Sequence, residues 1–152
     1  MFKKHLLNKR KITMYKILIA THANMAMGIK NSIEFITKSE IQVDYFNCFT
    51  DIVDPEKEID KYFSSCSSED KVVVLTDLMA GSVNQLFMKQ LEKSNFKLVT
   101  GINLPLALEI ILSNAYEDDD INNIIENAKN EIKYVNLEIE KFKNNQVDDD
   151  LF

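Results

Sequence analysis

The sequence predicts an α/β fold in which an open, mostly parallel sheet is covered by helices on both faces. Three observations lead to this prediction. Short apolar segments without polar alternation recur along the chain, which is typical of strands buried on both faces. Segments with apolar residues at helical spacing lie between them. Strands that alternate with helices in this way form right-handed crossovers and a parallel sheet.

The first half of the chain alternates strand and helix twice. The run KILIAT is apolar without alternation, and the segment after it has apolar residues at every third or fourth position. Asp54 followed by Pro55 marks a helix start, because aspartate caps free N–H groups and proline fits the first turn. The elements predicted here are strands at residues 16–21 and 41–46 and helices at about 25–38 and 55–64.

The second half repeats this pattern and ends in helices. The run KVVVLT is the strongest candidate for a central strand. The acids at residues 117–120 precede a helix, where the helix dipole favours negative charge. Residues 132–139 (IKYVNLEI) fit either an extension of that helix or a late strand. The elements predicted here are strands at 71–76 and 96–100 and helices at about 82–93, 104–113 and 121–129.

Charge divides the chain into a basic start and an acidic body. Residues 1–13 carry five of the 18 basic residues and no acid, so 13 basic residues remain against 24 acids. We expect residues 1–13 to be a disordered extension, with Met14 as the working start. We expect residues 14–143 to form one domain and residues 144–152 an acidic tail. Such an acidic body argues against nucleic acid as a partner.

Other classes of function lack their usual signals. No apolar run approaches the ~18 residues that span a bilayer, so no membrane span is predicted. Cys48 and Cys66 stand alone, with no CxxC motif, which suits a protein of the reducing cytoplasm. Three glycines are too few for a glycine-rich nucleotide loop, and no nucleophile elbow is present. We therefore expect neither a metal ion nor an organic cofactor.

Polar residues gather where the predicted strands end. His22 follows the first strand, Asp77 follows the third, and residues 101–103 follow the fourth. Ligands of open α/β sheets bind at the carboxyl ends of the strands, where the strand order reverses. With the order 2-1-3-4, that reversal would place His22 opposite Asp77. Each residue also has a plainer interpretation as a surface side chain or a turn, and for residues 101–103 we favour the turn.

These residue types suit the transfer of a phosphoryl group. A neutral imidazole nitrogen is a good nucleophile toward phosphorus and also a good leaving group, so His22 could take and release the group reversibly. Asp77 could accept the proton of the other ring nitrogen and so fix the tautomer. Gly81 and Ser82 open a helix whose free N–H groups could bind the anion, with Thr21 as a further ligand.

Three motifs stand out along the chain: ILIATHANMAMG at residues 17–28, VVVLTDLMAGSVNQ at 72–85 and VTGINLPLALE at 99–109. Together they resemble the IIA component of the mannose-type phosphoenolpyruvate-dependent sugar phosphotransferase system. This resemblance, which runs from about residue 15 to residue 142, implies that His22 is phosphorylated and that Asp77 supports it. It implies HPr as the phosphoryl donor, a IIB component as the acceptor, and IIC and IID membrane components that move the sugar. Because the chain ends soon after the matching region, we expect IIB to be a separate protein.

The resemblance also implies a homodimer that exchanges a late antiparallel strand, for which residues 132–139 are the candidate. The family's usual Gly-Gly-Ser-Pro after the aspartate is here Ala80-Gly81-Ser82-Val83. We expect that Ala80 does not need a positive φ. Two alternatives stay open: the phosphohistidine subunit of a dihydroxyacetone kinase, and a regulatory module in which phosphorylation of His22 is a switch. Either imidazole nitrogen could be the one phosphorylated.

Overall fold

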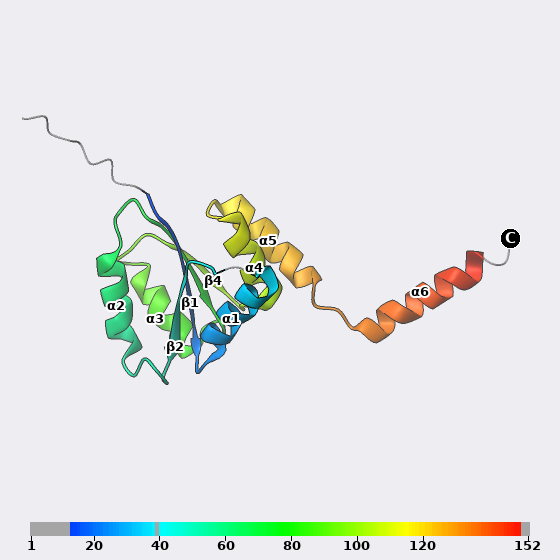
Figure 1. Cartoon of the computed structure of the whole chain (residues 1–152), viewed down its shortest axis with the longest axis horizontal. Helices are drawn as coiled ribbons and strands as arrows, with labels where there is room; N and C mark the ends of the chain where they lie inside the picture. The colour runs from blue at the N-terminus through cyan, green and yellow to red at the C-terminus, as the bar shows by residue number, and fades with distance from the viewer. Residues whose placement is uncertain (1–12, 39, 150–152) are drawn as a thin grey trace, which may run out of the picture.

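Four parallel strands form one sheet in the order β2-β1-β3-β4, which confirms the predicted order (Figure 1). The strands are β1 (Tyr15–His22), β2 (Val43–Cys48), β3 (Lys71–Thr76) and β4 (Lys97–Thr100). The computed structural model describes residues 13–38 and 40–149. The predicted disordered extension lies outside the described residues, apart from its last one.

Helices cover both faces of the sheet and enclose two apolar cores (Figure 1). Side chains of β1 alternate between the cores: Ile17 and Ile19 belong to one and Leu18 and Ala20 to the other. This double burial explains why the strand has no polar alternation. The first core is closed by α1 (Met25–Thr37), α4 (Leu104–Ser113) and α5 (Asp118–Asn130), and the second by α2 (Pro55–Ser65) and α3 (Ser82–Gln90).

Two helix boundaries differ from the prediction by three residues. α5 begins at Asp118 rather than 121, because the acidic side chains suit the first turn itself. α3 ends at Gln90 rather than 93, since residues 91–93 form a turn. Among the described residues, none of the helices is long and apolar enough to cross a bilayer.

Residues 132–139 do not form the predicted strand in this single chain. Residues 132–134 are irregular, and α6 (Val135–Asp149) begins directly after them and extends away from the sheet (Figure 1). An added edge strand needs a neighbour for its backbone hydrogen bonds, whereas a helix satisfies them internally. The ion pair between Glu138 and Lys141, 3.0 Å apart, supports the helix. Strand exchange between subunits stays a prediction, and the predicted tail belongs to α6 through Asp149.

Candidate functional site

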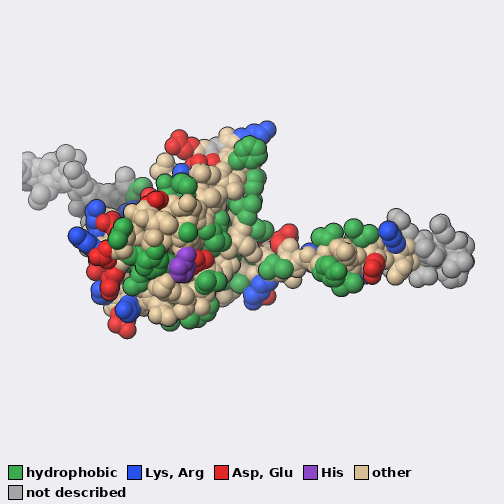
Figure 2. All heavy atoms as spheres, turned by 90° about the horizontal axis from the view of Figure 1, so that it is seen from below, with side chains coloured by type: hydrophobic (Ala, Val, Ile, Leu, Met, Phe, Trp, Pro, Cys, Tyr) green, Lys and Arg blue, Asp and Glu red, His purple; other side chains and the backbone are tan. Residues whose placement is uncertain are grey.

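His22 and Asp77 meet at the carboxyl edge of the sheet. His22 ends β1, Asp77 follows β3, and the register pairs Ala20 with Thr76. Oδ2 of Asp77 lies 2.7 Å from Nδ1 of His22 and accepts the His22 backbone N–H at 2.8 Å. The imidazole is 38% exposed, and hydrophobic side chains lie near it on this face, among polar and acidic ones (Figure 2). The structure thus brings together the two residues that the sequence predicted to face each other.

The environment of Asp77 keeps its carboxyl group ionised. Burial opposes ionisation, but hydrogen bonds from the backbone and ring of His22 and from the Leu78 N–H outweigh it and lower the pKa of Asp77. Because a carboxylate oxygen only accepts, Nδ1 of His22 has to donate. Nε2 then carries the free lone pair and points to the exposed side. This geometry favours Nε2 as the reactive nitrogen.

Ser82 faces the other nitrogen of the same ring. It is the first residue of α3, and its Oγ lies 2.8 Å from Nε2 of His22. Since Nε2 accepts, the Ser82 hydroxyl donates. Gly81 is the N-cap residue and has no side chain to occupy the first-turn N–H groups of α3. The hydroxyl and these N–H groups form a cradle suited to an anion bound on Nε2.

Gly81 lets this loop fold back tightly on Leu78, beside the imidazole. A Cβ at this position would lie 3.1 Å from Leu78 Cβ, 3.2 Å from the Leu78 carbonyl oxygen and 3.5 Å from Cε1 of His22. The first two distances are tighter than most Cβ contacts in proteins, so a side chain here would push Leu78 by a few tenths of an ångström. Glycine therefore relieves crowding at this position, whereas its φ of −65° would suit any residue.

Ala80 has a φ of +57°, so the prediction that it avoids positive φ was wrong. The Gly81 N–H closes a turn on the Leu78 carbonyl at 3.0 Å, and Ala80 is the third residue of that turn. Turns of type II require positive φ at this position, which costs an L-residue about 1–2 kcal/mol. Ala23 and Phe49 also have positive φ, at 51° and 64°, so strained backbone surrounds His22.

Phe49 and Thr21 have different places beside His22. The Phe49 ring is half-exposed and lies 5.8 Å from the imidazole, centroid to centroid. Thr21 is buried, and its Oγ1 accepts the Ala26 N–H of α1 at 2.8 Å and donates to the His22 carbonyl at 3.3 Å. Thr21 therefore fixes the start of α1 to the end of β1. Its position does not support the predicted contact with a phosphoryl group.

Sequence reasoning missed two buried asparagines at this edge. Asn84 is 2% exposed and Asn47 is 1% exposed. Asn47 accepts the Met27 N–H at 3.2 Å and donates to Asp51 at 2.8 Å, which connects β2 to α1 and to the following loop. The sequence signal that could have identified them is an asparagine at a position of a strand or helix that otherwise faces the core. Such residues are retained inside a protein only when their hydrogen bonds are satisfied.

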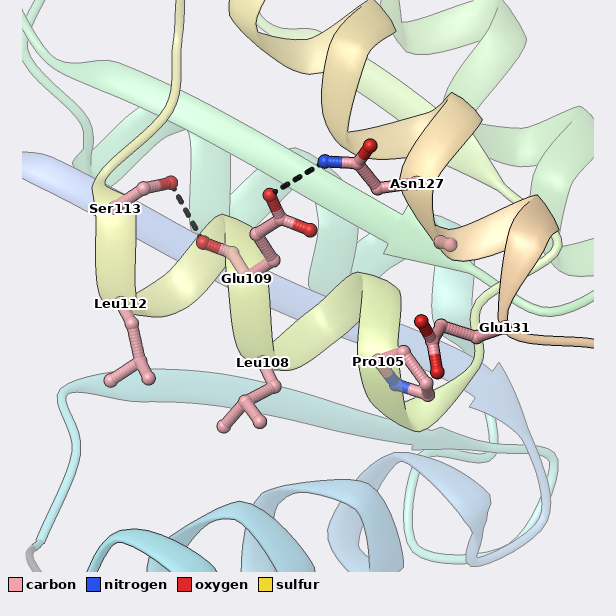
Figure 3. A pocket seen from close by; sticks show the side chains of 8 residues that line it. Pro105, Leu108, Glu109, Leu112, Ser113, Asn127 and Glu131 are labelled. Atoms are coloured by element: carbon pink, nitrogen blue, oxygen red, sulfur yellow. Dashed lines mark hydrogen bonds between the residues drawn. The ribbon is translucent and has the colours of Figure 1, made fainter.

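The remaining candidates have structural roles. Gly101 has a φ of +78° in the turn after β4, and Asn103 caps α4 by accepting the Leu106 N–H at 2.9 Å. In residues 13–38 and 40–149, no group of three or more His, Cys, Asp or Glu side chains is placed to hold a metal ion. A groove of about 510 Å³ lies between α4 and α5, where Glu109 pairs with Asn127 (Figure 3). This groove shares no lining residue with the His22 site.

Comparisons with known proteins identify the family of the chain. Residues 16–135 match the model of the family described as the PTS system fructose IIA component. A structure from Klebsiella pneumoniae, assigned to a phosphoenolpyruvate-dependent sugar phosphotransferase system as a permease, is 29% identical. It covers 82% of this chain and 93% of its own, with a TM-score of 0.73.

A second solved structure is the PTS IIA protein associated with the fucose utilization operon of Streptococcus pneumoniae. It is 26% identical, with a TM-score of 0.68 and coverage of 84% of this chain and 99% of its own. No curated protein matches the sequence. The matched residues span most of the chain and include the whole site. The chain therefore belongs to the family of PTS system fructose IIA components, the IIA-type components of sugar phosphotransferase systems.

Proposed function

We propose that the protein carries a phosphoryl group on Nε2 of His22, accepting it from phospho-HPr and passing it to a separate IIB component. One observation supports this most directly. Asp77 accepts a 2.7 Å hydrogen bond from the Nδ1–H of His22 and so leaves Nε2 as the nucleophile, beside the Ser82 hydroxyl. The reaction would take place in the cytoplasm and use no organic cofactor, because the phosphoryl group arrives already activated.

The transfer step needs no proton to leave the site. The Nε2 lone pair of His22 attacks phosphorus, and the P–N bond to the donor histidine breaks as the new P–N bond forms. The donor imidazole recovers its lone pair and becomes neutral. His22 keeps its proton on Nδ1, and the carboxylate of Asp77 stabilises the positive charge that develops on the ring. The hydroxyl of Ser82 then donates to a phosphoryl oxygen, and transfer to IIB reverses these steps.

The surface around His22 supports transfer between proteins. Large apolar side chains are exposed there, which is the composition expected at the centre of a protein interface. These residues are Met25, Phe49, Val53, Leu78 and Met79. Phe49 and Val53 also line a hollow of about 340 Å³ that reaches Ser82. HPr and IIB would dock on this surface in turn, and IIB would then supply the IIC and IID membrane components.

The test is phosphorylation by phosphoenolpyruvate, enzyme I and HPr. The wild type should incorporate labelled phosphate, and His22→Ala should not. His5→Ala replaces the only other histidine and is the matched control, which should keep the label. Rapid loss of label to one of a panel of IIB proteins supports the carrier over a regulatory module. Label retained in His22→Ala excludes the assignment.

A homodimer forms a separate part of the proposal. Residues 132–142 expose six large apolar side chains that nothing in the described chain covers. They are Ile132, Tyr134, Val135, Leu137, Ile139 and Phe142. A second subunit would bury them. Sedimentation equilibrium should therefore give twice the chain mass at micromolar concentration, and a monomer at all concentrations would contradict the dimer.

A further inference from the structure

Two side chains of α3 hold the loop that joins β3 to α3. Oδ1 of Asn84 accepts the Ala80 N–H at 3.2 Å. Nε2 of Gln85 donates to the Ala80 carbonyl at 2.7 Å. Both backbone groups of Ala80, the residue with positive φ, are therefore hydrogen-bonded to side chains of the helix that follows. We call this pair of side chains the Ala80 clamp.

Asn84 also connects the loop to the strand that carries Asp77. Its Nδ2 donates to Oγ1 of Thr76 at 3.0 Å, and Thr76 is the last residue of β3. The Ala80 N–H can only donate, so the amide oxygen of Asn84 has to face the loop and its NH₂ has to face Thr76. Asn84 is buried, so water does not replace either bond. One side chain thus fixes the loop relative to the end of β3.

The Ala80 clamp determines where Ser82 lies. Without it, only the turn closed by the Gly81 N–H on the Leu78 carbonyl would hold Ala80 in its left-handed conformation, because an L-residue prefers negative φ. A change of φ at this residue would move Gly81 and Ser82, which follow it directly. The Ser82 hydroxyl would then leave its position 2.8 Å from Nε2 of His22. The free N–H groups at the start of α3 would move with it.

We infer that Asn84 and Gln85 are positioning residues for phosphoryl transfer at His22. They act through Ala80 and do not touch the imidazole. The clamp holds the Ser82 hydroxyl and the first turn of α3 where the phosphoryl group has to be bound. This inference rests on the proposed function, and it predicts an effect on the transfer rate rather than on donor binding.

Single substitutions give the first test. Gln85 is exposed, so Gln85→Ala removes one hydrogen bond without leaving a cavity. It should slow single-turnover labelling by phospho-HPr about three- to tenfold, the factor that corresponds to one net hydrogen bond. Asn84→Ala should slow labelling by about tenfold or more, since it removes two bonds. The KM for phospho-HPr should stay within about twofold in both variants.

Ala80→Gly provides the decisive background. Glycine adopts positive φ without support, so the loop should keep its conformation when the clamp is removed. In a protein that already carries Ala80→Gly, the further substitution Asn84→Ala or Gln85→Ala should slow labelling by less than about twofold. The effects of the two substitutions are then not additive, as expected for residues that act on one another. An equal slowing in both backgrounds, or no slowing in either, would overturn the inference.

Gln90→Ala is the matched control for lost stability. Gln90 is a buried amide in the same helix, 5% exposed, and its Nε2 donates to Ser94 Oγ at 2.9 Å. Its replacement should lower the thermal midpoint of unfolding but leave the labelling rate unchanged. A control that slows labelling as much as Asn84→Ala would mean that both effects reflect stability alone, and the positioning role would be excluded.

A second measurement needs no phosphoryl donor. The ¹⁵N chemical shift of Nε2 in His22 reports its hydrogen bond with Ser82. The shift should change in Asn84→Ala and return when Ala80→Gly is added. An unchanged shift in Asn84→Ala would exclude the clamp even if the wild type is labelled and the proposed function therefore holds. If the wild type is not labelled at all, the proposed function fails, and this measurement still decides whether the clamp positions Ser82.

Discussion

Replacing Asp77 with asparagine tests how much of the site depends on its carboxylate. Asparagine has nearly the same shape, but it offers one acceptor oxygen and one NH₂ donor where aspartate offers two acceptors. In the wild type, Oδ2 accepts two hydrogen bonds from His22 and Oδ1 accepts the Leu78 N–H at 2.9 Å. In either orientation, therefore, the NH₂ group of the amide faces a backbone N–H, that of His22 or that of Leu78, and two donors meet.

The two orientations have different costs. With the amide oxygen toward His22, the Leu78 N–H loses its acceptor, and an unsatisfied N–H costs about 1–3 kcal/mol. With the NH₂ toward His22, Nδ1 has to become the acceptor, and the proton moves to Nε2. The nucleophilic lone pair is then on the wrong nitrogen. A comparable change in a serine-protease triad slows catalysis about 10⁴-fold, so we expect labelling to slow by about 10²–10⁴-fold.

Rapid-quench measurement of labelling by phospho-HPr gives the rate, and ¹⁵N NMR of His22 gives the tautomer. Asp44→Asn is the matched control, because Asp44 is a carboxylate in β2 that accepts the Tyr62 hydroxyl at 3.1 Å, away from His22. That variant should be labelled at the wild-type rate. If Asp77→Asn were labelled as fast as the wild type with its Nδ1–H tautomer intact, the assignment of Asp77 as the orienting group would be refuted.

Three further predictions concern the loop and acid stability. Ala80→Gly should raise the free energy of unfolding in urea by about 0.5–1 kcal/mol, since relief of positive φ exceeds the added chain entropy; a loss of stability would contradict the strain. Gly81→Ala should lower the free energy of unfolding by about 1 kcal/mol, because the new Cβ crowds Leu78, and it should also slow labelling. An unchanged labelling rate would show that the loop accommodates the Cβ without moving Ser82. A hydrogen bond from Lys16 lowers the pKa of Asp70, so stability from this pair is present above the unfolded pKa of about 3.9 and is lost as pH falls through the folded value. Lys16→Met should therefore weaken the dependence of stability on pH below about pH 4, which acid unfolding followed by circular dichroism measures. An unaltered pH profile would exclude a contribution from this pair.

The strand order and the meeting of His22 with Asp77 could be predicted from sequence because they follow from burial and chain direction. Apolar runs that lack alternation mark the central strands, and parallel strands bring their carboxyl ends to one edge. Residues placed directly after two such runs then have to lie close together. Local chemistry sufficed for some helix starts too, as with the side chain of Asp54, which accepts the Lys57 N–H at 3.2 Å.

The details that differ from prediction depend on tertiary contacts. The positive φ of Ala80 occurs within the Leu78–Gly81 turn and is accompanied by hydrogen bonds with Asn84 and Gln85, and alanine itself carries no signal for it. The side chain of Thr21 points toward α1 rather than the site, a choice that strand alternation alone does not decide. Residues 132–139 have apolar spacing that suits both strand and helix, so the pattern alone did not predict that α6 begins at Val135.

If His22 carries the phosphoryl group as proposed, the exposure of its ring would limit how long that group is kept. Because the imidazole is 38% exposed and Ser82 lies on the same open surface, water would reach the phosphorus as readily as a partner protein. The storage time would then be set by the intrinsic hydrolysis of the phosphorus–nitrogen bond rather than by a closed cavity. A docking partner would have to exclude solvent with its own side chains during the transfer.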